Sequence, residues 1–478
     1  MHITAIGIIL IPTSLVIFLL KPNYLVCWAI LVSTFQAASV LNVGGGFPIG
    51  ITPYFFVALL IAARFAVLYA SGRLSFDAQE PITYYLRPLW LLTLWAVCSA
   101  FLLPTLFAGV PVHVPRNGME ADALPLQWTM SNAAQAGYMV LNAVFVAYAI
   151  WLSSSFENTK SLFRAFCWSG ALAALIGIYQ LVSHMTGLFY PTEFFNSNPA
   201  WAQLTEQSLG DTWRMSASFT EPSAAGAFFA MWTAYVLCLT TYSSKVGASY
   251  WPLLWIGLTM LILTTATTGY FVVAAVLALF LGKQAARLLT RGTMNPRLLL
   301  AVFSFSAAIL VAMAILPDFM GLVGSVFGKI TNPDTSASSQ TRFGTVWPSL
   351  QLVSDTWGMG AGLGSNRPSG MLFYIVSNLG VPGIALFCHI VYVTYDLVFR
   401  MRYSNSYSLG MRPYVVASAW AFGVQLLAMI ISGAELSGSH LWISWALVLA
   451  ASRQAGLAAV LVPAEAEGED YRLREAVA

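Results

Sequence analysis

Residues 213–226 read WRMSASFTEPSAAG, and residues 227–239 continue as the apolar run AFFAMWTAYVLCL. We expect a run of this composition to form a helix inside a lipid bilayer. Arg214 and Glu221 therefore lie at the mouth of a membrane helix, where charged side chains are costly and usually functional. We interpret the rest of the chain as a membrane scaffold organised around them.

The composition of the whole chain also indicates a membrane protein. Of its 478 residues, 58% are hydrophobic and 9% are charged, whereas a soluble domain has about 25% charged residues. Mean hydropathy is +0.73. The cysteines form no C-x-x-C pair and the histidines show no H-x-x-x-H spacing. We therefore predict no disulfide framework, no metal site and no cofactor.

The apolar runs predict an all-α polytopic integral membrane protein with about 12–13 transmembrane helices. A span needs roughly 20 apolar residues. The candidate runs are 3–20, 24–42, 50–70, 88–109, 133–154, 165–187, 222–241, 251–265, 269–286, 298–316, 371–399, 413–432 and 438–452. Residues 1–461 are interpreted as a single transmembrane domain, followed by a short, charged tail at 462–478 that we expect to be disordered.

Basic residues concentrate in alternate loops, and this asymmetry sets the orientation. Of the 22 basic residues, 17 lie in the odd-numbered loops and the tail. The positive-inside rule makes that side cytoplasmic, together with the C-terminus. The other side has five basic residues, Arg116, Arg214, Lys329, Arg342 and Arg367. It also has the three longest loops, about 110–132, 188–221 and 317–370, and long loops are often functional.

Arg214 and Glu221 each have a structural and a functional interpretation. Pro222 suits the first turn of a helix, and Glu221 lies where the helix dipole favours a negative charge. The sequence therefore supports two roles for Glu221 equally well, a helix-capping acid and a catalytic group. Arg214 is an exception to the inside-positive distribution of basic residues. This exception favours a role in anion binding over the alternative, an interfacial side chain that reaches toward lipid headgroups.

A second arginine lies in the longest outer loop. Residues 339–347 read SQTRFGTVW, so polar residues precede Arg342 and an amphipathic run follows. This pattern is typical of an interfacial or re-entrant helix with Arg342 near its N-terminus. Free N–H groups at a helix N-terminus and a bidentate guanidinium both suit a phosphate. The alternative is a surface arginine in contact with lipid headgroups.

A glycine-rich stretch follows, and residues 358–369 read GMGAGLGSNRPS. It matches part of a G-x-G-x-x-G pattern, but no strand precedes it and it lies on the outer side, so we reject nucleotide binding. Its backbone can approach a ligand closely, with Ser365, Asn366 and Arg367 as donors. A simple glycine-rich connector is an equally good explanation of the glycines.

Two further candidates come from the outer loops. Aromatic residues crowd the loop before Arg214, and Trp213 is the nearest of them. Such residues mostly form interfacial belts, although some stack on sugars. His440 lies in the last outer loop and is either a substrate contact or a local hydrogen-bond partner.

The order, spacing and sidedness of these motifs resemble those of Wzy-type lipid-linked polysaccharide polymerases and the related O-antigen ligases. The resemblance rests on an arginine followed by FTEPS at 219–223, the threonine-rich break at 264–269, and the segment from Arg342 to NLGVPG at 378–383. It covers about residues 130–450.

The resemblance implies an enzyme of the bacterial inner membrane whose active site faces the periplasm. Such enzymes transfer a glycan from undecaprenyl diphosphate to an acceptor hydroxyl without a metal or a nucleotide. Carried over to this chain, Arg214 and Arg342 would hold the diphosphate, with Arg367 as a possible third cation. Ligases typically have a histidine after the glycine-rich turn, and residues 363–380 contain none. This difference favours a polymerase and leaves the general base unassigned, with Glu221 as the best candidate.

The implied partners are an undecaprenyl-diphosphate-linked oligosaccharide, the growing polysaccharide chain and membrane lipids. A chain-length regulator and a flippase are possible protein partners, and no nucleic acid is expected. The first alternative is a ligase that transfers glycan to lipid A-core or another acceptor. The second is a transporter of lipid-linked glycan or polysaccharide, although transporter sites usually lie within helices at the midplane.

Overall fold

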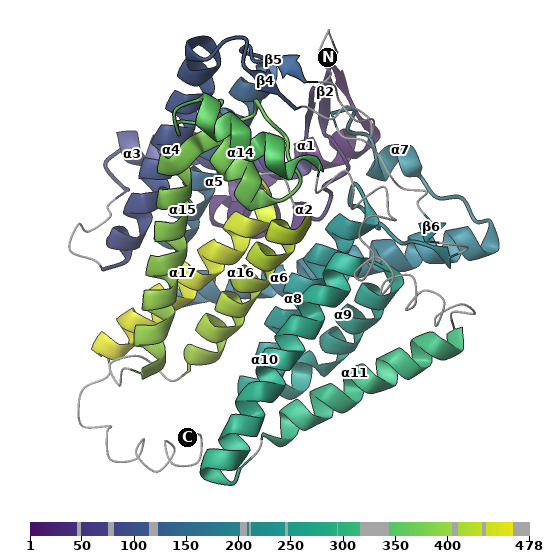
Figure 1. Ribbon diagram of the computed structural model, residues 1–478. Coiled ribbons are helices and arrows are strands. Elements are labelled where there is room, and N and C mark those ends of the chain that lie inside the picture. Colours follow the sequence, from purple (N-terminus) through teal and green to yellow (C-terminus); the bar gives the residue numbers. More distant parts are fainter. Residues whose placement is uncertain are drawn as a thin grey trace.

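The structure is a computed structural model. It describes residues 1–44, 49–74, 81–113, 123–200, 208–209, 212–243, 247–293, 295–315, 344–403, 410–432 and 436–461. These residues form a bundle of helices (Figure 1). Within the described ranges, eight helices are long and apolar enough to cross a membrane. The prediction of a multi-pass, all-α membrane protein is therefore confirmed.

The helices and strands have the following bounds. The eight long apolar helices are α3 (Pro53–Ala70), α4 (Pro81–Leu106), α5 (Met130–Leu152), α6 (Phe156–Thr186), α8 (Pro222–Tyr242), α10 (Thr267–Arg291), α15 (Met371–Tyr403) and α16 (Arg412–Ser432). The other helices are α1 (Ala5–Leu20), α2 (Leu25–Val32), α7 (Thr192–Phe195), α9 (Trp251–Leu263), α11 (Pro296–Ile315), α14 (Val346–Asp355) and α17 (Ser439–Leu461). The strands are β1 (His2–Ile3), β2 (Leu41–Val43), β3 (Ile49–Ile51), β4 (Pro111–Val112), β5 (Leu124–Pro125), β6 (Ser208–Leu209) and β7 (Thr212–Trp213).

The second predicted span, 24–42, is too long. Helix α2 ends at Val32, because the polar residues that follow bond elsewhere. The hydroxyls of Ser33 and Thr34 turn back onto carbonyls of α2. The N–H of Ala37 then donates to the carbonyl of Ser218 (3.0 Å). Local side-chain hydrogen bonds of this kind compete with helix continuation.

Helices α9 and α10 are separate, as the threonine-rich break predicts. The three residues between them are Thr264, Thr265 and Ala266. Thr265 has φ 46°, in the left-handed region that a β-branched residue rarely adopts. The chain reverses at this point, so α9 and α10 form an apolar pair that both pack against α8.

Helix α15 is broken at Gly380, which has φ 65° and ψ −161°. Pro382 has no N–H to complete the helix ladder across the break. The glycine-rich segment, residues 358–364, supplies the missing partners. Its bonds to the break are Ala361 N–H to Ser377 O, Gly362 N–H to Asn378 O, and Val381 N–H to Gly358 O, each at 2.8 Å. The ring N–H of Trp95 binds the carbonyl of Leu379 (2.8 Å).

Helix α8, the helix that follows Glu221, lies at the centre of the bundle. It is the most deeply buried of the eight long helices, and it packs against α16, α9 and α10. Strands β2, β4 and β5 and helix α14 lie at one end of the bundle (Figure 1). This end carries the loop of Arg367, which bonds to His113 just after β4, and the turn that follows Arg214, which bonds to Ala37 shortly before β2.

Connections predicted to share a membrane face do meet in space. Strand β1 at the N-terminus pairs with β2 in the connection between α2 and α3. The N–H of Arg367 donates to the carbonyl of His113 in the connection between α4 and α5 (3.0 Å). At the opposite end, the guanidinium groups of Arg453 and Arg297 bind carbonyls at the C-termini of α5 and α8. Cations there are favoured by the helix dipoles.

Substituting Gly360 with alanine should destabilise the fold. Gly360 has φ 84°, and a Cβ there would lie 2.6 Å from backbone atoms of Asn378 and Gly380. We expect a loss of about 2–4 kcal/mol in the free energy of unfolding, measured by denaturation in detergent micelles. The matched control is Gly72→Ala, where φ is 68° but no atom lies within 4 Å, so only about 1 kcal/mol should be lost. Equal losses would contradict the tight packing at the α15 break.

Candidate functional site

Arg214 lies just after β7 and contacts the break between α9 and α10. Its Nε donates to the hydroxyl of Thr265 (3.1 Å), and the side chain is half-buried. The guanidinium also interacts electrostatically with the hydroxyl of Tyr270 on α10. The connection between α6 and α8 is thereby tied to a turn that is 51 residues further along the chain. Such an anchored cation has a defined position from which to bind an anion.

The C-terminal end of α9 holds this segment in place. The N–H of Met215 donates to the carbonyl of Leu263 (3.3 Å), and the hydroxyl of Tyr270 donates to the carbonyl of Ile262 (2.7 Å). Both carbonyls belong to the last turn of α9, where a helix has no donors of its own. The left-handed conformation of the buried Thr265 is retained because these contacts surround it.

Gln180 on α6 fixes the turn that follows Arg214. Its Oε1 accepts from the N–H groups of Ser216 (3.1 Å) and Ala217 (2.7 Å), and its Nε2 donates to the hydroxyl of Ser216 (3.1 Å). Ala217 is buried with φ 52°, so this turn is also strained. The hydroxyl of Tyr190 donates to the carbonyl of Ala217 (3.2 Å), and burial raises the pKa of this hydroxyl.

Glu221 occupies the N-cap position of α8. Its backbone is extended, and its carbonyl accepts from the N–H groups of Ala224 (3.1 Å) and Ala225 (3.2 Å). Its carboxylate makes no capping hydrogen bond and instead accepts from the hydroxyl of Ser223. The capping interpretation therefore applies to the backbone of Glu221, while its half-buried carboxylate is turned toward a neighbouring hydroxyl.

Trp213 stacks on the ring of His184, near the end of α6. The ring centroids are 4.4 Å apart and the planes are inclined by 12°. Trp213 is half-buried, so one of its faces is already used for packing. This contact helps to hold the chain that leads into Arg214. A role for Trp213 in sugar stacking stays a prediction.

Arg367 lies in a second polar region, at the N-terminus of α5. Its guanidinium reaches the hydroxyl of Ser131 (3.4 Å) in the first turn of that helix. Gly364 has φ 87° and packs against the same turn, where a Cβ would lie 2.9 Å from the carbonyl of Ser131. Arg367 and the N–H end of α5 together form a positive region that suits an anion.

Ser365 and Asn366 use their polar groups within the fold. The hydroxyl of Ser365 accepts from Nδ2 of Asn132 (2.8 Å). The amide of Asn366 donates to Ser377 (3.0 Å) and accepts from the N–H of His113 (3.0 Å). Both residues are buried. In this arrangement they hold the loop on which Arg367 stands, and their proposed direct contact with substrate stays a prediction.

Asn378, beside the break in α15, connects this loop to the helix. Its Oδ1 accepts from the N–H groups of Ser365 (3.0 Å) and Asn366 (2.9 Å). Its Nδ2 donates to the carbonyls of Asn366 (2.8 Å) and Tyr374 (2.9 Å). One amide side chain therefore fixes both the glycine-rich loop and the broken helix.

His440 is buried at the start of α17. Its Nε2 lies 3.4 Å from the hydroxyl of Ser33, and its ring packs near Phe219 and Phe228. Ser33 already donates its hydroxyl hydrogen to the carbonyl of Ile30 (2.8 Å), so Nε2 is the donor in this contact. These contacts agree with the second of the two interpretations from the sequence, in which His440 is a local hydrogen-bond partner.

The proposed cations are not all brought together. Arg342 lies within residues 316–343, outside the described part of the chain, so its pairing with Arg214 stays a prediction. Arg214 contacts the α9–α10 break, whereas Arg367 contacts α5 and the loop before β5. The two arginines thus belong to separate polar regions at the same end of the bundle. Among the described residues, no group of three His, Cys, Asp or Glu side chains could hold a metal ion.

Four polar residues that build these regions were not among the candidate site residues from the sequence, although Thr265 and Asn378 lie in motifs that carry the resemblance. Gln180, Asn132 and Asn378 lie in or beside apolar runs, where the cost of burying an amide is itself a signal. Thr265 was hidden among other threonines. Nothing in the sequence indicates which distant loop each of these side chains contacts.

Comparison with known proteins adds no family assignment. Searches of protein-family models and of curated proteins found no match to this chain.

Replacing Gln180 with leucine should destabilise the turn after Arg214. The change leaves the buried N–H groups of Ser216 and Ala217 without their acceptor, which should lower the free energy of unfolding by about 2–4 kcal/mol. Denaturation in detergent micelles measures this loss. The control is Gln425→Leu on α16, because Oε1 of Gln425 has no partner within the described structure. That variant should be neutral or slightly stabilised, and a similar loss in both would contradict the assigned role of Gln180.

Proposed function

We propose that this chain is a membrane glycosyltransferase that polymerises oligosaccharide repeat units linked to undecaprenyl diphosphate. The observation that carries the proposal is the position of Arg214. Its guanidinium is held by Thr265 at a break between two membrane helices. The same break packs closely against Gly226 near the start of α8, the helix that Glu221 precedes. A fixed guanidinium at the end of membrane helices suits the diphosphate of a substrate whose tail lies in the bilayer.

In the proposed reaction, an acceptor sugar hydroxyl attacks the anomeric carbon of the donor. A glycosidic bond forms, the bond from that carbon to the diphosphate oxygen breaks, and the hydroxyl proton leaves. Arg214 stabilises the charge that develops on the departing diphosphate, and Arg342 from the longest outer loop is its proposed partner. Glu221 is the candidate base that takes the proton.

The second polar region contributes a further cation. Arg367, at the N-terminus of α5, would contact the same substrate or the growing chain. Ser365 and Asn366 would act mainly by holding the loop that carries it. Trp213 and His440 complete the proposed substrate-binding set. The ring of His440 packs near Phe219 in the turn that follows Arg214.

The proposed setting is the bacterial inner membrane, with the site at the periplasmic face and the C-terminus in the cytoplasm. The proposed protein partners are a flippase that delivers the donor and a chain-length regulator. The basic end of the bundle, with Arg297 and Arg453 at helix C-termini, would then face the cytoplasm.

Replacing Arg214 with alanine should abolish long polymer, while single lipid-linked repeat units still accumulate. The loss of the guanidinium should lower turnover about 100-fold or more. Arg214→Lys keeps the charge but loses the bidentate geometry, so it should retain about a tenth of the activity. The assay is the length distribution of polymer made from a purified lipid-linked repeat unit in proteoliposomes.

The control for this assay is Lys160→Gln. Lys160 pairs with Glu157 (3.2 Å) on an exposed turn at the start of α6, so its loss should leave chain lengths unchanged. Wild-type chain lengths in Arg214→Ala would overturn the proposal. Transfer only to an added lipid A-core acceptor would indicate a ligase, and substrate movement without bond formation would indicate a transporter.

The proposed orientation predicts the outcome of reporter fusions. Alkaline phosphatase fused within the outer loop at 110–132 should be active, because that enzyme folds only outside the cytoplasm. The same enzyme fused after residue 461 should be inactive, and a fluorescent protein placed there should fluoresce. The reverse pattern would put Arg214 on the cytoplasmic side and exclude the periplasmic reaction.

A further inference from the structure

Arg64 is a basic residue inside a membrane span, far from the two polar regions described above. It lies eleven residues after Pro53 and six before Ala70, the two ends of α3, and its side chain is half-buried. Within the described part of the chain, no carboxylate forms an ion pair with it. A cation within a membrane helix is costly, so it usually marks a functional site and has a specific partner.

The helices around Arg64 contain no residue that could neutralise it. Helix α3 packs against α1, α2 and α5, and α5 packs in turn against α17. None of these five helices contains an Asp or a Glu, whereas α17 adds a second cation, Arg453. The anion that balances Arg64 therefore comes from outside these helices.

The guanidinium of Arg64 lies beside a buried tyrosine on α5. It interacts electrostatically with the hydroxyl of Tyr148, which is 0% exposed. Nε of Arg64 and Oη of Tyr148 are both buried, and neither has a hydrogen-bond partner in the described structure. The ring of Tyr148 stacks on Trp151, with centroids 5.6 Å apart, so its position is fixed. A phosphate oxygen is the kind of acceptor that both groups lack.

This pair lies near the end of the bundle that carries Arg453. Tyr148 comes four residues before Leu152, the last residue of α5, which is about 6 Å along the helix axis. Arg453 donates to the carbonyls of Ile150 (2.6 Å) and Trp151 (3.2 Å) and so offsets the negative end of the helix dipole. Where α5 spans the hydrocarbon, phospholipid phosphates lie just beyond this end of the helix.

A lipid can reach Arg64 from the outer face of α3. Leu59 and Val67 on this helix are 47% and 56% exposed. Val67 lies three residues after Arg64, so the two side chains are neighbours on the helix surface. In a membrane the exposed apolar side chains contact acyl chains, and the long arginine side chain extends toward the headgroups.

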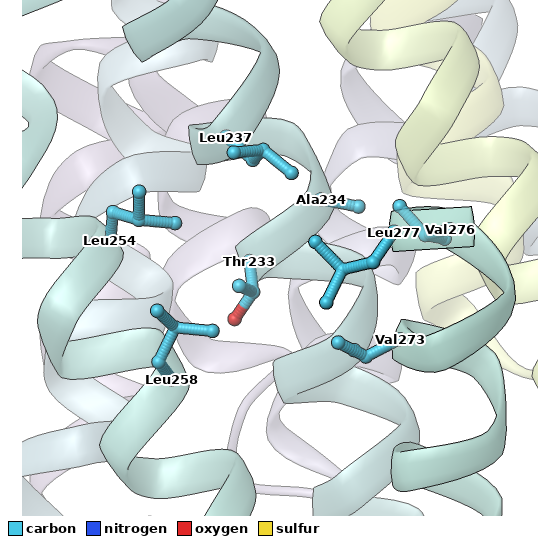
Figure 2. Close-up of a pocket in the computed structure, with 8 residues that line it drawn as sticks. All are labelled: Thr233, Ala234, Leu237, Leu254, Leu258, Val273, Val276 and Leu277. Atoms are coloured by element: carbon cyan, nitrogen blue, oxygen red, sulfur yellow. The ribbon is translucent and has the colours of Figure 1, made fainter. Parts of the chain in front are cut away.

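The cavity between α8, α9 and α10 offers no comparable site for an anion (Figure 2). Seven of its eight lining residues are aliphatic, and Thr233 contributes the one hydroxyl. No cation lines it, so an anion that entered would lose its hydration without gaining a partner.

We propose that Arg64 and Tyr148 bind the phosphate of an anionic phospholipid, such as phosphatidylglycerol, in the leaflet at the basic end of the bundle. Basic sites between transmembrane helices are suited to such headgroups. The acyl chains would lie along the exposed face of α3. A zwitterionic lipid is disfavoured, because its ammonium group would lie near two arginines. The site is at the opposite end from Arg214 and is independent of the proposed function.

The first test measures lipid binding to the full-length protein in detergent micelles by native mass spectrometry. Wild-type protein should bind phosphatidylglycerol more tightly than phosphatidylethanolamine. Arg64→Gln should weaken binding of phosphatidylglycerol about fivefold, the effect expected of one basic residue beside an anionic lipid, and leave phosphatidylethanolamine unchanged. Arg64→Lys keeps the charge and should keep the preference.

The matched control is Arg400→Gln, near the end of α15. Arg400 already pairs with Asp396 (2.8 Å), and its side chain is 66% exposed. This variant should bind both lipids as the wild type does. Phosphatidylglycerol should also raise the melting temperature of the wild type and of Arg400→Gln, but not that of Arg64→Gln.

A second variant tests the site without removing its charge. Tyr148→Phe keeps the stacked ring and loses only the hydroxyl, so it should fold and bind phosphatidylglycerol about threefold more weakly. Equal affinity of the wild type for the two lipids, or unchanged binding in both Arg64→Gln and Tyr148→Phe, would overturn the proposal. Displacement of the lipid by millimolar inorganic phosphate would identify a soluble phosphate as the ligand and contradict the lipid assignment.

Discussion

Every backbone N–H and C=O group of a membrane-embedded segment must find a partner inside the protein, because hydrocarbon offers none. This constraint explains the two irregular points in the bundle. At the α9–α10 break, Met215 and Tyr270 bind the last carbonyls of α9. At Gly380, the glycine-rich segment 358–364 supplies donors and an acceptor to the interrupted helix α15.

Both points place functional candidates at the same end of the bundle. The first carries Arg214, and the second carries the loop of Arg367. In each case a buried amide completes the arrangement, Gln180 for the first and Asn378 for the second. Backbone interruptions in membrane helices are tolerated where other parts of the protein satisfy them. The polar groups assembled for that purpose also hold the two arginines in fixed positions.

Much of the architecture was predictable from hydropathy and charge. Each of the thirteen apolar runs overlaps a helix, and eight of the described helices are long and apolar enough to cross a membrane. The error at 24–42 arose because Ser33 and Thr34 bond locally and end α2 early. For Glu221 the sequence supports a capping role and a catalytic role equally well. The structure shows that its backbone caps α8, while its carboxylate accepts a hydrogen bond from Ser223.

Hydropathy alone shows that this chain crosses a membrane many times, and the distribution of charge predicts that few cations lie on the face opposite its basic loops. Those properties depend on the composition of each segment alone. The tertiary structure decided which distant residues meet: Arg214 with Thr265, and Ser365 and Asn366 with Asn378. It also separated Arg214 from Arg367, since each is anchored to different helices. Such pairings depend on how helices pack, and no local pattern encodes them.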